Sequence, residues 1–298
     1  MQNSTDKLPL EFELPIGLSV EGVVQKHIEL LPANGVAEKI FTSKFPEKPY
    51  TWMAYVLCAS IKNLAGVSIA EKCRKEFMET GSITIPSILQ KLSLADVNTC
   101  LVEIHRRIWE RYIKNQEVSC KQCGQKMLVD IDLSKVIMEQ KFDERLQSIE
   151  SWEYLTVSLD DKFKFTSPRI MGTNQVGNYE EFDGVEFDEI VFKTPSLLEG
   201  IKNEKDVSDS VVMWRKIAFD CCEIIRESTT GVELPTHLVK AMGLKLYNEI
   251  LSSSDLKKIR RLLREEIPTM PFYYNDTCVC PKKLEVPITM EAGSFFSE

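Results

Sequence analysis

The stretch Ser119–Leu133, with the sequence SCKQCGQKMLVDIDL, recurs in altered form at the end of the chain. The second version is CVCPKKLEVPITM at residues 278–290, and aligning Cys123 with Cys280 brings the next ten positions into register without a gap. In both versions, apolar residues alternate with other residues after the cysteines, which is the pattern of a strand with one buried face. The aligned apolar residues are Met127, Val129, Ile131 and Leu133 in the first version and Leu284, Val286, Ile288 and Met290 in the second. Each cysteine pair and its strand therefore look like the end of a repeated module.

The match extends upstream of the cysteines. Ser93-x-x-Asp96 and Ser252-x-x-Asp255 each open a helical pattern, and the serine of such a motif caps an N–H of the first helical turn. The spacing from Asp96 to Cys120 is 24 residues, and the spacing from Asp255 to Cys278 is 23. We therefore predict a tandem duplication, with an N-terminal module at residues 1–140 and a C-terminal module at 141–298.

In both modules the sequence pattern predicts strands, then helices, then a strand. This order predicts an α+β fold of two tandem related modules, each with a small antiparallel sheet and helices and each ending in a cysteine-pair turn plus a β-strand. Hairpins are expected over 10–31 and around the turn Asp160-Asp161. Helices are expected over 51–64, 69–79, 96–114, 211–226, 236–251 and 255–267.

Bulk composition narrows the class of protein. The chain has 298 residues, of which 43% are hydrophobic, and a net charge of −8. An acidic chain is a poor match for the phosphate backbone, so nucleic acid is an unlikely main partner. The longest apolar run in the first half, Met53–Ile61, is too short to span a bilayer, and the N-terminus has no apolar signal segment, so we expect no membrane association. The nine cysteines then read as reduced thiols of a cytosolic protein.

Four of these cysteines are candidate metal ligands. Cys120-x-x-Cys123 has the spacing of a zinc knuckle, and Cys278-x-Cys280 is tighter but can still chelate. If the two turns meet, four thiolates would hold one structural zinc ion that staples the modules together. Two alternatives stay open: the pairs belong to turns without metal, or Cys120-x-x-Cys123 is a redox pair, although its flanking sequence lacks the usual strand–helix–strand context.

The remaining reactive residues form no catalytic pattern. Five cysteines lie on helical segments and are expected in the core, and the three histidines stand far apart. No phosphate loop, nucleophile elbow or His-Glu-x-x-His motif is present, so we expect a protein that is not an enzyme. The helical cysteines are Cys58, Cys73, Cys100, Cys221 and Cys222, and the histidines are His27, His105 and His237.

Two groups of charged residues are expected to be solvated faces. An acidic group lies between Glu180 and Glu189, without the spacing of a calcium loop, and its alternative role is docking to a basic partner. Basic residues recur at matching helical places in the two modules. They are Arg106, Arg107, Arg111 and Lys114 in the first module and Lys257, Lys258, Arg260, Arg261 and Arg264 in the second.

With the duplication, the cysteine pairs and the terminal Gly293-Ser294-Phe295-Phe296, the sequence resembles the baseplate hub and hub-assembly proteins of T-even-type contractile-tailed bacteriophages. The resemblance covers residues 10 to 296 in pattern and layout. The sequence departs from the family pattern at Cys278-x-Cys280, where a Cys-x-x-Cys would match better. It implies a non-enzymatic hub component or hub-assembly factor, whose partners are other baseplate and tail hub proteins. It also implies a location in the virion tail baseplate, and in the host cytoplasm during assembly.

A second function remains open on the residues alone. A cytosolic zinc-ribbon-type adaptor could contact nucleic acid through the two basic helix faces, and its binding would then weaken steeply with salt.

Overall fold

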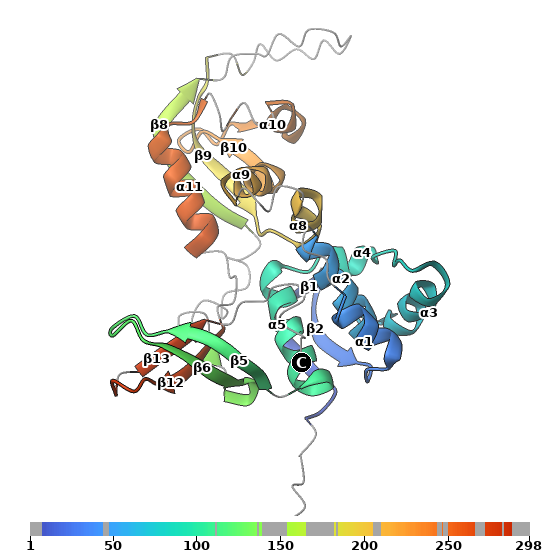
Figure 1. Cartoon of the computed structure of the whole chain (residues 1–298). Coiled ribbons are helices and arrows are strands. Elements are labelled where there is room, and N and C mark those ends of the chain that lie inside the picture. Colours follow the sequence, from blue (N-terminus) through green and yellow to red (C-terminus); the bar gives the residue numbers. More distant parts are fainter. Residues whose placement is uncertain are drawn as a thin grey trace, which may run out of the picture. The chain divides into compact units, whose positions relative to one another are not determined.

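The structure is a computed structural model. It describes residues 8–43, 48–110, 112–135, 137–138, 154–164, 182, 184–204, 210–242, 246, 250–265, 272–281 and 283–287. These residues fall into two compact units (Figure 1). Unit 1 comprises Met1–Gln147, Ser196–Glu204 and Pro268–Glu298, and unit 2 comprises Ser148–Pro195 and Lys205–Ile267. The units are defined by contacts in space, whereas the module boundary at 140 concerns the order of the repeat along the chain and stays a prediction.

Unit 1 is built on a four-stranded antiparallel sheet in the order β1-β2-β3-β4. Its strands are β1 (Glu11–Val20), β2 (Val23–Leu30), β3 (Ile61–Leu64) and β4 (Val67–Ser68). The helices of this unit are α1 (Gly35–Phe41), α2 (Pro49–Ser60), α3 (Ala70–Thr80), α4 (Ser87–Gln90), α5 (Leu94–Ile104) and α8 (Leu197–Asn203). The core lies around α2, whose Trp52, Val56 and Leu57 are fully buried.

Unit 2 is built on a second four-stranded antiparallel sheet, in which β8, β9, β10 and β11 are neighbours in that order. Its strands are β8 (Tyr154–Lys164), β9 (Glu186–Lys193), β10 (Cys222–Arg226) and β11 (Glu233–Leu234). Its helices are α9 (Ser210–Cys221), α10 (Thr236–Met242) and α11 (Ser253–Glu265). Mixed α+β architecture with small antiparallel sheets is thus confirmed.

Several expected helices are shorter than predicted. Helices α2 and α9 each pass directly into the third strand of their sheet, so Ile61–Leu64 and Cys222–Arg226 are strands and not helical ends. Helix α5 stops at Ile104, a π-helical turn spans His105–Trp109, and a strand replaces the end of the helix expected to reach Lys114. The prediction for 236–251 holds over α10, and most of the rest of that range lies outside the described residues.

The expected turn at Asp160-Asp161 is a bulge inside one long strand. β8 continues through it, and its register against β9 shifts between Ser158 and Phe163. β1 has the same irregularity, because its register against β2 shifts between Glu13 and Leu18.

A buried aspartate holds each bulge. In unit 1, Asp96 is 0% exposed; its carboxylate accepts the N–H of Ile16 at 3.0 Å, the N–H of Gly17 at 3.2 Å and the hydroxyl of Ser93 at 2.9 Å. The N–H of Asp96 in turn donates to the Ser93 oxygen, which caps α5. One side chain thereby caps a helix and satisfies the backbone of an irregular strand.

Unit 2 repeats this arrangement at α11. Asp255 is also 0% exposed, and its carboxylate accepts the N–H of Asp160 at 2.7 Å and the hydroxyl of Ser252 at 2.7 Å. Its own N–H donates to the Ser252 oxygen at 3.2 Å. We call each of these arrangements an aspartate clamp.

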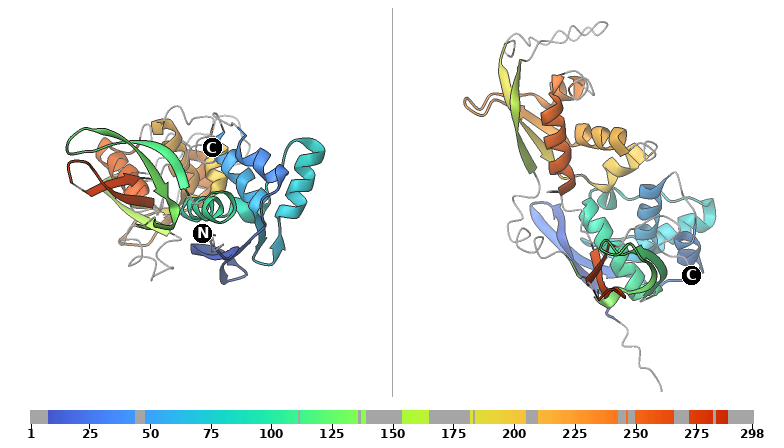
Figure 2. Two further views of the ribbon diagram at one scale, coloured as in Figure 1. Left: turned by 60° about the horizontal axis from the view of Figure 1, so that its bottom comes forward. Right: turned by 60° about the vertical axis from the view of Figure 1, so that its left-hand side comes forward.

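Two further hairpins complete unit 1. β5 (Tyr112–Ser119) pairs with β6 (Lys126–Asp132), and β12 (Phe272–Thr277) pairs with β13 (Lys283–Pro287) on one side and with β7 (Ile137–Met138) on the other. Within unit 1 the β5–β6 and β12–β13 hairpins lie side by side in Figures 1 and 2. Val129, Ile131 and Leu133 are buried, as the period-two pattern predicts.

None of the helices within the described residues combines the length and the apolar character that a membrane span needs.

Candidate metal centre

The first cysteine pair sits in the turn between β5 and β6. The N–H of Cys120 donates to the Gln125 carbonyl at 3.0 Å, and the N–H of Gly124 donates to the Cys120 carbonyl at 2.8 Å. Gly124 has φ = 72°, in the left-handed region that favours glycine, so this residue lets the chain turn back sharply after Cys123. The turn points both thiols to the same side.

The second pair lies between β12 and β13. The last register pair of this hairpin is Thr277 with Lys283, so Cys278 and Cys280 fall in the connection beyond it. The single residue between them, Val279, is well exposed, whereas Cys278 is buried and Cys280 is half-buried. Both pairs are therefore carried at the end of a hairpin of unit 1.

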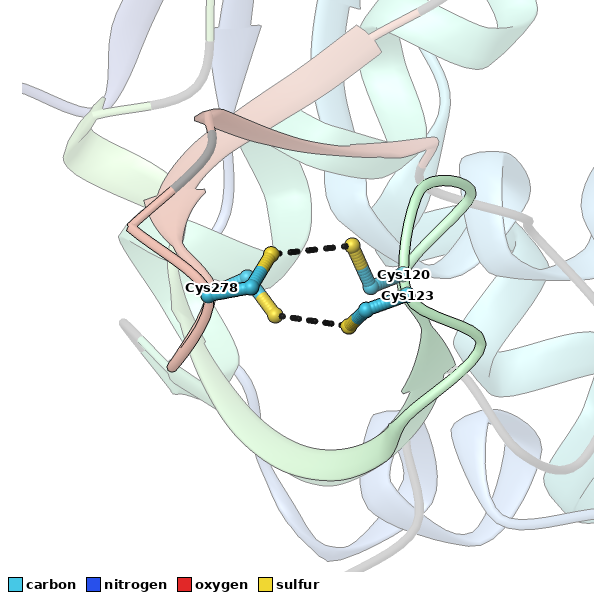
Figure 3. Close-up of side chains that lie close together, drawn as sticks. Cys120, Cys123 and Cys278 are labelled. Carbon is cyan, nitrogen blue, oxygen red and sulfur yellow. Dashed lines mark hydrogen bonds between the residues drawn. The ribbon is translucent and has the colours of Figure 1, made fainter.

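The four thiols converge. Cys120 Sγ lies 3.9 Å from Cys280 Sγ, and Cys123 Sγ lies 3.6 Å from Cys278 Sγ (Figure 3). All four sulfur atoms lie within 4.8 Å of one another. In a tetrahedral zinc–thiolate centre with Zn–S bonds of about 2.3 Å, neighbouring sulfurs stand about 3.8 Å apart. The cluster thus has the dimensions of such a centre, and all nine cysteines of the chain are free thiols.

The backbone of the first turn favours a thiolate. N–H groups of Cys123 and Gln122 point at the sulfur of Cys120 and lower the pKa of this thiol to about 6. The pKa of Cys278 is raised, because burial and the neighbouring cysteine sulfurs oppose its ionisation. A cation placed among the sulfurs would remove this opposition, because metal ligands bind as thiolates.

A zinc ion bound by all four thiolates would be structural and not catalytic in type. Four thiolates fill a tetrahedral zinc ion and leave no position for a substrate. Cys120 and Cys278 are buried while Cys123 is exposed, so the cluster lies close to the surface. A metal here would join two hairpins whose cysteines are 155 to 160 residues apart in the chain.

The other candidate residues lie away from this cluster. Cys58, Cys73, Cys100, Cys221 and Cys222 are buried. His27 lies beside Glu11 and Glu13 on the β1–β2 hairpin, and the buried His105 contacts the Glu110 carbonyl. His237 is an exposed residue of α10.

Some residues of the acidic group between Glu180 and Glu189 form hydrogen bonds and ion pairs within unit 2. On β9, Asp188 accepts hydrogen bonds from Ser228 and pairs with Lys162, and Glu189 pairs with Arg226. Glu180, Glu181 and Asp183 lie outside the described residues.

Several basic residues of the first module also form ion pairs within unit 1. Arg106 and Arg107 both pair with Glu103, and Lys114 pairs with Glu110. Arg107 also donates to the Pro9 carbonyl. Arg111 is not among the described residues. The described basic residues that were expected to match those of α11 are therefore paired with acidic neighbours in unit 1.

The aspartate clamps were missed by sequence reasoning. The sequence marks Asp96 and Asp255 only as helix-cap residues, because the strand N–H groups that they accept lie 80 and 95 residues away. The signal that could have found them is the aspartate in the place where capping boxes usually have glutamate.

Comparison with known proteins gives no relative: no protein-family model matches the chain, and neither a curated protein nor a solved structure matches it.

Proposed function

We propose that Cys120, Cys123, Cys278 and Cys280 hold one structural zinc ion. The observation that carries the proposal is the spacing of the four sulfurs, which matches the edges of a zinc–thiolate tetrahedron. β12 is joined to β7 by only two register pairs, Phe272 with Met138 and Tyr273 with Ile137. Zinc would tie the terminal hairpin to the β5–β6 hairpin.

Elemental analysis of protein purified under reducing conditions tests the zinc site. The expected result is one zinc per chain in the wild type and none in Cys280→Ser, with Cys221→Ala as a control that removes a buried thiol outside the cluster. Absence of zinc from the wild type, or retention of zinc by Cys280→Ser at full occupancy, would leave the pairs as turn residues.

The duplication is the second part of the proposal. Its support is that the two four-stranded sheets share one strand order, that a helix enters the third strand directly in both, and that both carry an aspartate clamp. The aspartates align the two helices that carry them, so that residue n of α5 stands opposite residue n + 159 of α11.

The function that fits these features is non-enzymatic. We propose a component or assembly factor of a contractile phage tail baseplate hub, acting through protein–protein contacts in the host cytoplasm and in the virion. The support is the sequence resemblance and the use of a metal for architecture; two similar modules would offer two similar surfaces to a symmetric ring. The nucleic-acid adaptor is supported only by α11, since Arg106 and Arg107 are paired internally.

Co-purification tests this role. The tagged chain should retain baseplate and tail hub proteins from phage-infected cells, and should do so after nuclease treatment. Retention of nucleic acid in place of these proteins would favour the adaptor instead.

A further inference from the structure

Helices α2 and α9 give up backbone hydrogen bonds where each passes directly into a strand. In a continuous helix the Ala59 carbonyl would accept the N–H of Asn63, but Asn63 lies in β3 and pairs with Glu29. The Asp220 carbonyl likewise loses the N–H of Ile224, which lies in β10. A carbonyl at such a junction costs free energy unless another donor replaces the one that is lost.

In unit 1 the replacement donor is Arg74 of α3. Its guanidinium group donates to the Ala59 carbonyl at 2.8 Å, and also to the carbonyls of Leu31 at 3.2 Å and Pro32 at 2.8 Å. Leu31 and Pro32 directly follow β2, so one side chain joins the end of α2 to the segment that leaves the neighbouring strand. Because Arg74 is buried, its removal would deprive these carbonyls of a donor that water does not readily replace.

In unit 2 the replacement donor is Lys240 of α10. Its ammonium group donates to the carbonyls of Phe219 at 3.4 Å, Asp220 at 3.0 Å and Cys222 at 2.9 Å. These carbonyls belong to the last turn of α9 and the first residue of β10. The ammonium group also lies 5.5 Å from the centre of the Phe219 ring, where a cation–π contact adds to the attraction. One lysine therefore holds the whole junction between α9 and β10.

Arg74 and Lys240 hold the same place in the two units. Each is the fifth residue of the helix that follows the third and fourth strands of its sheet. Each donates to the carbonyl two positions before the third strand, which is that of Ala59 in unit 1 and of Asp220 in unit 2. The sequence conceals this match, because the cation follows its carbonyl partner by 15 residues in unit 1 and by 20 in unit 2.

We propose that Arg74 and Lys240 are equivalent cationic caps, each of which holds the point where a helix becomes the third strand of its sheet. A cation at this end of a helix binds the last carbonyls and is attracted by their partial negative charge. The two caps differ in reach, because the planar fork of arginine joins two segments, whereas the single ammonium group of lysine serves one junction. The equivalence of the caps rests on the proposed duplication, and it uses neither the zinc site nor the hub role.

Amide hydrogen exchange on the full chain tests the cap of unit 2. Lys240→Met keeps a long side chain without its charge, and should speed exchange of the Cys222–Arg226 amides at least about tenfold while Ile61–Leu64 stays within about twofold of wild type. Lys240→Arg keeps the charge and the donors, so its exchange should match that of the wild type. The control is Lys257→Met, which removes an exposed lysine of α11 and should leave both strands unchanged.

The reciprocal change tests the cap of unit 1. Arg74→Met should speed exchange of the Ile61–Leu64 amides at least about tenfold and leave Cys222–Arg226 within about twofold of wild type. Arg74→Lys is the milder variant and is decisive where Arg74→Met does not fold. One ammonium group cannot serve both segments, so this variant should speed exchange of the same amides by a smaller factor. The control is Lys72→Met, at an exposed position of α3.

Three outcomes would overturn the proposal. They are a response at only one third strand or at neither, an equal rise in exchange throughout the unit that carries the substitution, and the same exchange in Lys240→Arg as in Lys240→Met. The zinc and co-purification tests report on other residues. Their failure beside a positive exchange result would reject the zinc site and the hub role and keep the caps. The reverse result would reject the caps alone and leave the duplication supported by its strand order and aspartate clamps.

Discussion

Helix α5 of unit 1 and helix α11 of unit 2 share a device at their first turn and differ on the face beside it. Both begin with a serine cap and a fully buried aspartate that holds the bulge of a neighbouring strand. Yet Val102 is buried on α5, whereas Arg261, at the matching position of α11, is exposed. The groups that fix the backbone are the same in both units, and the groups that meet the surroundings are different.

The two kinds of position differ in how much a substitution should destabilise the fold. Replacing a clamp aspartate would leave strand N–H groups without partners, at a cost of about 1–3 kcal/mol each where they are buried. Replacing an exposed residue of α11 leaves the clamp intact, and substitutions at exposed positions usually change stability by less than about 0.5 kcal/mol. The residues on the outer face of each helix can therefore differ between the two units while both units keep the aspartate clamp.

Removing the proposed zinc ion should give the largest contrast between the units. Structural zinc in small motifs contributes about 10–16 kcal/mol of apparent binding free energy at neutral pH, and only unit 1 contains the four-cysteine cluster. Chelation should abolish amide hydrogen-exchange protection of β12–β13 and leave the β8–β9 pairing protected. Unchanged protection of β12–β13 after verified zinc loss would contradict this expectation.

The Asp96 clamp should make unit 1 sensitive to pH. Burial raises the pKa of Asp96 from 3.8 to about 6, although the N–H groups of Ile16 and Gly17 and the Ser93 hydroxyl oppose the shift. The folded state binds this proton more tightly than the unfolded chain. The resulting stabilisation is complete below about pH 4 and is lost as the pH rises through about 6.

A shift of this size corresponds to about 3 kcal/mol between pH 4 and pH 7. Urea unfolding of unit 1 should therefore show a stability decrease over this range that is absent in Asp96→Asn, which carries no ionisable group at this position. Parallel pH profiles for the two proteins would rule out this role of Asp96.

The two bulges should also respond differently to side chains, because only the β1 bulge contains a glycine. Gly17 has φ = 88°, and an added Cβ would stand 2.9 Å from the Gln25 carbonyl oxygen. Gly22 has φ = 80° but open space around it. Gly17→Ala should cost about 2 kcal/mol more than Gly22→Ala, measured by thermal unfolding, because both strain the backbone and only the first also clashes.

The helix caps should give the smallest and most equal effects. Ser93→Ala and Ser252→Ala each remove a cap and a hydroxyl donor to the clamp, at a cost of about 1 kcal/mol. Ser93 is the more buried of the two, so its loss should cost slightly more. A negligible effect at Ser252, with a large effect at Ser93, would mean that the two clamps are not equivalent.

The sequence was most informative where a pattern repeats. The spacing of the cysteine pairs and their shared context singled out the four residues whose sulfurs converge. Period-two alternation after Cys123 also predicted β6 and its buried face. These features are local, so they can be read from neighbouring residues alone.

The sequence was least informative where a distant contact decides. Ile61–Leu64 continues the apolar pattern of α2, and only pairing with β2 makes it a strand. Asp160-Asp161 has the composition of a turn, but Asp255 binds the backbone of Asp160 from 95 residues away and stabilises a bulge. The end of α5 was missed for a similar reason, because only pairing with β6 makes the residues from Tyr112 onward a strand.

Every residue of unit 2 lies between Cys123 and Cys278 in sequence, so a metal across the cluster would turn the intervening polypeptide into a closed ring. A single protease cut anywhere in that ring would open it without releasing either product. The two pieces would travel together under native conditions and separate only when the metal is withdrawn.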